Sequence, residues 1–382
     1  MKILMISMPS IHFFRWTEQL KDSGHDIYWF NVTDSDQAVR RMDWINQHYG
    51  WRLKWDFPGR TRLKSLFPKL SKFIEKLNTN ATYKAFENYL NQVKPDVVHS
   101  FVLYQSCVPI LEVMKKYSHV SWIYSAWGND LYYYQNFPNF KNDIVNTLPH
   151  LDFMFADCQR DIDLAYKLGF KGETLGVFPG GGGYDLTMIK EDLKQPKQRS
   201  GIIIKGYQGD KHRALNILKA LERFNEIPKI TIFSANEILI DYIERSDKLV
   251  SEKFKIYSQK ESIIHDELCR MMNKHLIYIG NNLSDGMPNT LLEAICFGAF
   301  PIQSNPGDAT AEIIENGVNG LLINDCEDVE HIKSLIEHAL TDKILIGKAF
   351  EINKKIRKSL EFDIIKKQVL VKYQHVQNKL EC

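Results

Sequence analysis

The stretch between residues 284 and 298 has the residue types that bind a phosphate. Pro288 suits the first turn of a helix and Gly298 suits its end, so a helix is expected between them. The start of such a helix has unpaired N–H groups and the positive end of the helix dipole, which together attract an anion. Gly286 lacks a side chain that would block the approach. Because Pro288 has no N–H, the expected backbone donors are Asn289, Thr290 and Leu291.

Two acids, Asp285 and Glu293, stand on this segment with seven residues between them. Glu293 lies in an otherwise apolar helix, where an ionised carboxylate is costly unless it has a partner. A ribose diol is one such partner. The alternative is that Asp285 only stabilises the helix start and that Glu293 has a structural partner within the protein.

A second group of charged residues follows the expected strand at 201–205. Lys205 ends this strand, and Lys211 and Arg213 precede the next expected helix at 214–221. Cations near a helix start oppose its dipole unless an anion is present, which favours an anion site here. The alternative is that these charges are simply solvated.

Both groups need a scaffold, and the sequence predicts an α/β one. Short apolar runs alternate with helical periodicity, the pattern of βαβ units and a mostly parallel sheet. The pattern lapses in the polar stretch 187–200 and then restarts, so two such domains are expected. Residues 276–323 are expected to run strand, loop, helix, strand, loop, helix, strand, and 344–382 to be helical with Tyr373 in a core. The expected strands are 2–8, 26–32, 97–101, 122–125, 153–156, 201–205, 230–234, 276–279 and 299–303, with a helix at 14–23.

Composition excludes several other classes. The 382 residues are 25% charged and 44% hydrophobic, with a formal net charge of +2. Disorder, collagen, a coiled coil and a wholly nucleic-acid-binding surface are therefore not expected. The sequence has no 18-residue uncharged apolar stretch and no signal-peptide cleavage region, and its six cysteines form no CxxC pair. A cytoplasmic protein is the expectation.

The segment SDGMPNTLLEA, followed by GAFPI and EIIENGVNGLL, resembles the retaining glycosyltransferases of family 4. The resemblance implies the GT-B fold, in which two Rossmann-like domains face a central cleft and the last helix returns to the first domain. The domains implied are 1–190 for the acceptor and 191–358 for the nucleotide sugar, with 359–382 as the returning helix. The family usually has Glu where this chain has Asp285.

The resemblance also implies roles for the residues above. Glu293 would bind the ribose of a sugar nucleotide, Asp285 the hydroxyls of the transferred sugar, and the amides at the helix start the diphosphate. Lys205 matches the first of two basic residues that neutralise the leaving diphosphate. Arg213 is favoured for the second, with Lys211 as its substitute. No cofactor and no metal are implied.

In the N-terminal half, the segment SAWGND (125–130) resembles the family's His-Gly-x-Asp motif. Trp127 replaces the histidine that lies near the reacting sugar, so Gly128 and Asp130 rank ahead of it as acceptor-side residues. His12, in the first loop, and Gly181, in a glycine-rich loop, are further expected cleft residues. His12 and His99 each have a structural alternative.

Segment 51–76 mixes eight basic residues with two acidic ones and interleaves aromatic residues, including Trp51, among them. This mixture suits an anionic lipid surface. The alternative is a helix pair packed on the sheet with a solvated basic face. RNA could bind through the same residue types, but no RNA-binding motif accompanies this segment. The Asp-x-Asp triplets at 34–36 and 161–163 are interpreted as solvated acids rather than metal ligands.

The leading hypothesis is therefore a retaining transferase that moves a sugar from a nucleotide donor, UDP ahead of GDP, to a glycan or lipid-linked glycan. Surface polysaccharide assembly, at the inner face of the plasma membrane, is the expected setting. A sugar-nucleotide epimerase or a phosphorylase of the same fold, and an inactive GT-B-shaped scaffold, are the alternatives.

Overall fold

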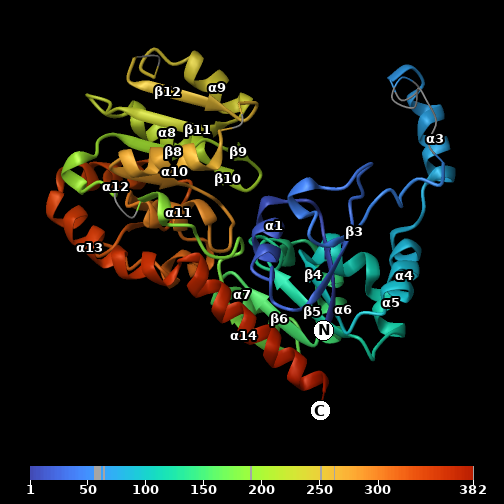
Figure 1. Ribbon diagram of the computed structural model, residues 1–382. Coiled ribbons are helices and arrows are strands. Elements are labelled where there is room, and N and C mark those ends of the chain that lie inside the picture. Colours follow the sequence, from blue (N-terminus) through green and yellow to red (C-terminus); the bar gives the residue numbers. More distant parts are fainter. Residues whose placement is uncertain (56–61, 63–64, 190–191, 250–251, 262, 382) are drawn as a thin grey trace. The chain divides into compact units, whose positions relative to one another are not determined.

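The computed structural model describes residues 1–55, 62, 65–189, 192–249, 252–261 and 263–381. Contacts between residues divide the chain into two compact units (Figure 1). Unit 1 comprises Met1–Ala156, Ile162–Gly176 and Val369–Cys382, and unit 2 comprises Asp157–Asp161 and Val177–Gln368. The domain boundaries expected at 190 and 358 stay predictions.

Unit 1 is built on a seven-stranded sheet with the order β3-β2-β1-β4-β5-β6-β7. Its core pairs, β1 with β2 and with β4, are parallel, and Met5 lies opposite His99 in this register. Successive residues of β1, such as Leu4 and Met5, point to opposite faces and are both fully buried, so both faces of the sheet are covered. The strands are β1 (Lys2–Ser7), β2 (Asp26–Asn31), β3 (Asn46–His48), β4 (Val97–Phe101), β5 (Ser121–Ala126), β6 (Phe153–Ala156) and β7 (Glu173–Val177).

The helices of unit 1 follow the strands in βαβ order. Helix α1 begins earlier than its apolar pattern predicts, because the Ser10 hydroxyl accepts a hydrogen bond from the amide of Phe13 and caps the first turn. The helices are α1 (Ile11–Glu18), α3 (Pro68–Asn78), α4 (Thr82–Val93), α5 (Leu111–Lys116), α6 (Pro138–Thr147) and α7 (Gln159–Lys167).

The last helix, α14 (Phe362–Leu380), ends in unit 1. This agrees with the expectation that the C-terminal helix returns to the first domain. The Tyr373 side chain is fully buried and its hydroxyl lies 2.7 Å from His99 Nδ1. The same hydroxyl accepts a hydrogen bond from Trp16 Nε1 at 3.1 Å. At the surface His375 contacts Glu173 at 2.8 Å. The C-terminal helix therefore completes the core of the N-terminal domain.

Unit 2 has a six-stranded, fully parallel sheet with the order β12-β11-β8-β13-β14-β15. Its strands are β8 (Ile202–Lys205), β11 (Ile230–Ala235), β12 (Phe254–Ser258), β13 (Ile277–Gly280), β14 (Phe300–Ser304) and β15 (Leu321–Ile323). A separate antiparallel hairpin joins β9 (Gln208–Gly209) to β10 (His212–Arg213). The helices are α8 (Ala214–Glu222), α9 (Glu237–Glu244), α10 (His265–Lys274), α11 (Asn289–Cys296), α12 (Val329–Thr341) and α13 (Lys343–Ser359).

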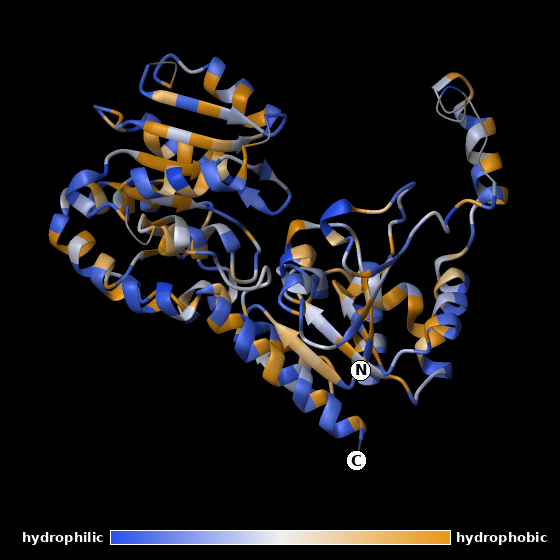
Figure 2. Cartoon of the chain, in the orientation of Figure 1, coloured by the Kyte–Doolittle hydropathy of each residue, from blue (hydrophilic) through white to orange (hydrophobic). Residues whose placement is uncertain are grey.

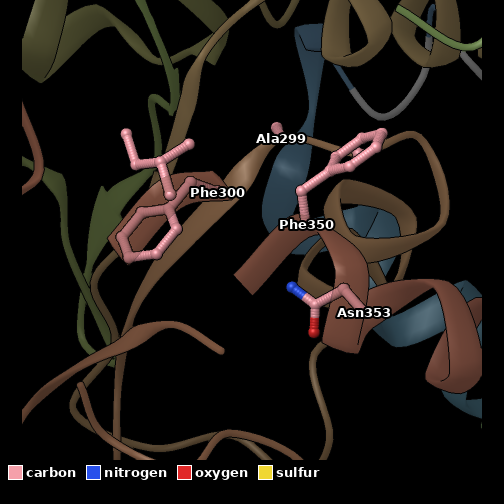
Figure 3. A pocket seen from close by; sticks show the side chains of 6 residues that line it. Ala299, Phe300, Phe350 and Asn353 are labelled. Carbon is pink, nitrogen blue, oxygen red and sulfur yellow. The ribbon is translucent and has the colours of Figure 1, made fainter. Parts of the chain in front are cut away.

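Helix α13 packs against the start of β14, and a small cavity remains between them (Figure 3). Phe350 and Asn353 of α13 line it together with Ala299 and Phe300 (Figure 3). Its volume of about 10 Å³ admits no more than one water molecule, so this cavity is a packing defect and not a ligand site. Among the described residues, no helix is long and apolar enough to cross a membrane.

The expected strands and the α/β fold class are confirmed, with ends that differ by one residue in most strands. One expected element is wrong. The second helix predicted between 276 and 323 is instead a pair of short 3-10 turns, Pro306–Asp308 and Thr310–Glu312. Gly307 adopts φ 58° there, and this left-handed conformation breaks a continuous helix.

Candidate functional site

Asp285 lies in the loop 281–288, called here the α11 loop, which connects β13 to α11. Its carboxylate is held in place, because Oδ2 accepts a hydrogen bond from Asn282 Nδ2 at 2.9 Å and Oδ1 accepts one from the amide of Gly286 at 3.0 Å. A Cβ on Gly286 would meet the Asp157 carboxylate at 2.3 Å, so a larger residue here would force the Asp157 side chain to move. The loop therefore presents a fixed carboxylate beside a helix start without a blocking side chain.

Basic side chains from the β9–β10 hairpin and from β8 lie near this carboxylate. His212 Nδ1 contacts Asn282 Oδ1 at 2.8 Å. Burial lowers the pKa of His212, the Asn282 contact opposes this, and the charges of Lys205, Asp285 and Lys211 act on the same imidazole. Lys205, Lys211 and Asp285 therefore lie close enough to His212 for their charges to act on it, and burial favours the neutral imidazole.

Arg213 has a different environment from the two lysines. Its guanidinium forms an ion pair with Glu327 and donates hydrogen bonds to the carbonyl oxygens of Gly209 and Asp210. These contacts fasten the hairpin to the loop before α12. The role of Arg213 at the leaving diphosphate stays a prediction, as does that of Lys211, whose charge acts on the neighbouring His212.

The three expected amide donors begin α11 as predicted, with Pro288 as the N-cap. Tyrosine hydroxyls hold two of their side chains: Tyr184 lies 2.9 Å from Asn289 Oδ1, and Tyr278 lies 2.9 Å from Thr290 Oγ1. The amide of Leu291 donates to the Pro288 carbonyl at 3.0 Å, so this expected donor already has a partner within the helix start. The helix start is therefore positioned rigidly before any ligand arrives.

Glu293 is buried in α11, with 5% of its side chain exposed. Its Oε1 lies 2.7 Å from Nε2 of His265, the first residue of α10. The partner that a carboxylate needs at this depth is thus supplied within the protein, as the structural alternative proposed. Its role toward a ribose is not tested by this contact.

Arg160 fixes the backbone of the α11 loop from behind. Its Nη1 donates to the carbonyl oxygens of Asp285 at 2.9 Å and Pro306 at 2.6 Å, and it forms an ion pair with Asp161. The Glu312 carboxylate accepts hydrogen bonds from the amides of Gln159 and Arg160. One guanidinium therefore holds the α11 loop and the turn at Pro306 together.

The interpretation of Asp161 as a solvated acid is wrong, because this side chain is fully buried. Burial raises its pKa, and the Arg160 charge opposes the rise. Asp157, Cys158 and Asp161 lie close enough together to hold a metal ion. Burial raises the pKa of the Cys158 thiol, which leaves it protonated and a poor ligand, and Arg160 already supplies a positive charge. The absence of a metal stays a prediction.

In unit 1 the expected acceptor-side residues follow β5, in residues 127–137, called here the β5 loop. The rings of His12 and Trp127 lie 6.1 Å apart in an edge-to-face arrangement, so two of these residues meet. Gly128 adopts φ 61°, a left-handed conformation that favours glycine. The Asp130 carboxylate is buried, and Oδ2 accepts hydrogen bonds from the Leu103 amide and the Tyr124 hydroxyl. Asp130 thus shapes the loop from inside.

Two remaining expectations concern single residues. Gly181 is buried in unit 2, in a turn closed by a 2.8 Å bond from the Gly182 amide to the Pro179 carbonyl. Its role at a cleft stays a prediction.

His99 is fully buried between Tyr373 and Ser125, with Nε2 lying 2.8 Å from the Ser125 hydroxyl. Burial lowers its pKa to about 3, so the structural alternative fits His99.

Sequence reasoning missed His212, His265 and Arg160. His212 stands between two residues that the sequence singled out, yet nothing in the local pattern separates it from them. His265 and Arg160 are 28 and 125 residues from their partners, Glu293 and Asp285. Only the packing of α10 on α11, and of the 157–161 segment on the α11 loop, reveals them.

Solved structures share this fold at low sequence identity. Sucrose-phosphate synthase from Thermosynechococcus elongatus superposes with a TM-score of 0.73 over 99% of both chains at 13% identity. The apo lipopolysaccharide outer core galactosyltransferase WaaB gives 0.68 over 98% of this chain and 99% of its own, at 12% identity. Anabaena Alr3699/HepE in complex with UDP and glucose gives 0.65, with the same coverage and identity. The two Rossmann-like units and the returning helix are the GT-B fold.

The model of the family described as "Glycosyl transferases group 1" matches residues 245–359, which contain the α11 loop, α11 and α13. No curated protein sequence matches the chain. This segment is thus similar to the group 1 glycosyltransferases, the family that the sequence resembles, and the chain as a whole has the GT-B fold.

Proposed function

We propose that this glycosyltransferase moves a sugar, with retention of configuration, from a UDP-sugar to a glycan or lipid-linked glycan acceptor. The observation that carries the proposal is the group formed by Asp285, Lys205, Lys211 and the start of α11. It combines a fixed carboxylate for sugar hydroxyls with two cations and a helix N-terminus for a diphosphate.

In this proposal each group has one task. The amides at the start of α11 bind the diphosphate, and Lys205 with Lys211 neutralises the charge that develops as it leaves. Asp285 orients the transferred sugar and Glu293 binds the ribose. The bond from the anomeric carbon to the diphosphate breaks as the acceptor oxygen attacks on the same face. The leaving phosphate oxygen takes the acceptor's proton, so no enzyme nucleophile is needed.

Solved structures of the same fold support UDP as the nucleotide. The Anabaena protein was solved with UDP and glucose, and the pneumococcal O-GlcNAc transferase GtfA with UDP and GlcNAc. The name of WaaB, an outer core lipopolysaccharide galactosyltransferase, supports a bacterial-type surface polysaccharide as the product class. His12, Trp127, Gly128, Asp130 and Gly181 are the proposed acceptor-side residues.

Thermal-shift titration with UDP, GDP, ADP and dTDP, first without metal and then with Mg²⁺, tests the nucleotide. A ligand at about a hundred times its dissociation constant adds about 2.7 kcal/mol to the free energy of unfolding. We expect UDP to give the largest shift without metal. A larger shift with GDP would reassign the base, and no shift with any diphosphate would contradict a donor site at α11.

Turnover separates transfer from the alternatives of the same fold. A transferase consumes the nucleotide sugar in proportion to added acceptor and releases the nucleoside diphosphate. An epimerase converts the sugar without an acceptor, and a phosphorylase requires inorganic phosphate. Anomeric NMR of the product then tests retention, because an inverted linkage would contradict the proposed mechanism.

We also propose that the α3 region attaches the enzyme to an anionic membrane surface, at the inner face of the plasma membrane. Hydrophobic and hydrophilic residues share this helix (Figure 2). Leu66, Phe67 and Leu70 are 50–70% exposed, and Lys69 lies among them. Residues 56–61 and 63–64, and the side chains of 72, 73 and 76, lie outside the described residues. The expectation that Trp51 contributes to a lipid-binding surface is wrong, because Trp51 is buried and stacks on Phe30.

Co-sedimentation with vesicles checks this attachment. We expect the protein to bind vesicles of phosphatidylglycerol and phosphatidylcholine, with binding that weakens as salt rises, and not to bind phosphatidylcholine alone. Replacing Leu66, Phe67 and Leu70 by Ser should release the protein while leaving its melting temperature unchanged. Equal binding of the triple variant would contradict the proposal.

A further inference from the structure

His265 makes a contact that no part of the donor chemistry above uses. Its Nε2 lies 2.7 Å from Oε1 of Glu293, and the two residues come from different helices, α10 and α11. Glu293 is 5% exposed in its side chain, whereas His265 is 32% exposed. The imidazole therefore reaches from the surface of unit 2 to a carboxylate that is almost fully buried.

The packing around His265 holds the ring in one orientation. Cys269 follows one turn later on α10, and its sulfur lies 3.7 Å from His265 Nδ1. Cys269 is itself buried, beneath α11 neighbours such as Leu291 and Leu292 in the same core cluster. The same sulfur lies 3.6 Å from Nε2, so it packs against both ring nitrogens, and with Nε2 on Glu293 the imidazole has little rotational freedom.

The contact also fixes the carboxylate. In its Nε2–H tautomer, His265 donates this hydrogen bond to the Glu293 carboxylate. A hydrogen bond to a charged group is stronger than one between neutral groups, and it holds the Glu293 side chain in a single rotamer. A carboxylate held in this way loses no side-chain freedom when a hydroxyl group binds to it.

We propose that His265 is a positioning residue that holds Glu293 for the ribose hydroxyls of the donor and so makes the enzyme select ribonucleotides over 2′-deoxyribonucleotides. This inference rests on the proposed function, in which Glu293 binds the ribose. It adds the residue that makes the carboxylate selective. Without His265, the carboxylate turns toward solvent and its preference for a ribose hydroxyl falls.

The experiment compares a ribonucleotide with its deoxy analogue on the full chain. Dissociation constants of UDP and 2′-deoxy-UDP are measured by isothermal titration calorimetry for the wild type, His265→Ala, His265→Gln and Glu293→Gln. His338→Ala is the matched control, since His338 is a half-exposed histidine of α12 that contacts Asp342. The readout is the ratio of the two constants, which a loss of overall stability does not change.

We expect the wild type and His338→Ala to prefer UDP by about 10-fold or more, the value of one hydrogen bond to a charged group. His265→Ala and Glu293→Gln should both bring the ratio close to 1. His265→Gln should restore part of the preference, because its amide can still donate to Glu293 Oε1.

Three outcomes separate the failures. If the wild type binds neither nucleotide, the proposed function fails. If Glu293→Gln removes the preference but His265→Ala retains all of it, the inference about His265 is overturned while the donor site stands. If His265→Ala and His265→Gln lose the preference equally, His265 acts through packing and the positioning role is overturned.

Discussion

The α11 loop of unit 2 and the β5 loop of unit 1 both follow the carboxyl end of a parallel strand, yet they are built from different chemistry. In the α11 loop a hydrogen-bonded acid, Asp285, stands beside cations and a helix start. In the β5 loop the acid, Asp130, is turned inward, and an aromatic side chain, Trp127, contacts His12 instead. One loop is organised by charge and the other by aromatic surface.

This difference matches what each loop is proposed to bind. A diphosphate has a fixed geometry and a large charge, so a rigid set of charged groups recognises it best. A sugar acceptor is neutral over most of its surface, and aromatic side chains give contact area without requiring one fixed orientation. The comparison predicts that charge-removing changes act strongly at the α11 loop and that changes at the β5 loop act mildly and on the acceptor alone.

The largest expected effect is that of Asp285→Asn. Asn keeps the size of the side chain but removes the charge that orients the transferred sugar, so kcat should fall by about 10³-fold. Binding of UDP should change little, because Asp285 is proposed to contact the sugar and not the nucleotide. Asp308→Asn, in an exposed 3-10 turn of the same unit, is the matched control. Transfer at the wild-type rate in Asp285→Asn would contradict the assignment.

The lysines of β8 and of the β9–β10 hairpin give the second largest effect. Lys205→Ala and Lys211→Ala should each lower kcat by about 10²-fold, since each removes a charge that stabilises the leaving diphosphate. Arg213→Ala should mainly lower the melting temperature, because this guanidinium is paired with Glu327. Steady-state rates and thermal unfolding of the three variants decide the matter. If Arg213→Ala loses kcat while Lys211→Ala retains the wild-type kcat, Arg213 and not Lys211 is the second cation at the diphosphate.

The sequence predicts more of the α11 loop than of the β5 loop, and the reason is physical. Gly286, Pro288 and Glu293 are recognisable because a helix start, a missing side chain and a buried charge each leave a local pattern. The partners of these residues, such as Arg160 and His265, come from distant segments and depend on tertiary packing. In the β5 loop the inward turn of Asp130 depends on contacts with Leu103 and Tyr124, which local spacing does not reveal.

Tyr373 of the returning helix contacts His99, which in turn contacts Ser125 of β5. The variant Tyr373→Phe tests whether this helix stabilises unit 1. The change removes the hydroxyl between Trp16 Nε1 and His99 Nδ1 and leaves two buried polar groups without it. We expect the free energy of unfolding to fall by about 1–3 kcal/mol, with kcat unchanged below the transition. Denaturant unfolding checks this. An unchanged stability would mean that the buried hydroxyl contributes nothing to the attachment of α14.

At the β5 loop itself, Trp127→Ala should raise the KM for the acceptor by about 10-fold, as expected for the loss of one aromatic contact surface. The KM for the nucleotide sugar should stay the same. Trp127→Phe retains a ring and should recover much of the loss. Initial rates at varied acceptor concentration, with saturating donor, provide the measurement. A rise in the donor KM instead would place Trp127 on the donor side and remove the proposed contrast between the two loops.

The smallest expected effect is a pH dependence from His99, and its sign follows from burial. Burial lowers the pKa of His99 to about 3, so the folded protein keeps this histidine neutral, whereas the unfolded chain protonates it near pH 6.5. The unfolded state therefore binds the extra proton. The contribution of His99 to stability is complete above pH 6.5, and it is lost progressively as the pH falls from there toward 3. Between pH 7 and 6 the loss should be less than about 1 kcal/mol.

In His99→Gln, which cannot titrate, the drop in melting temperature over this interval should be smaller than in the wild type. An equal drop would show that the acid sensitivity comes from other histidines whose pKa values burial also lowers. These are the partly buried His25, His48 and His212 and the buried His275.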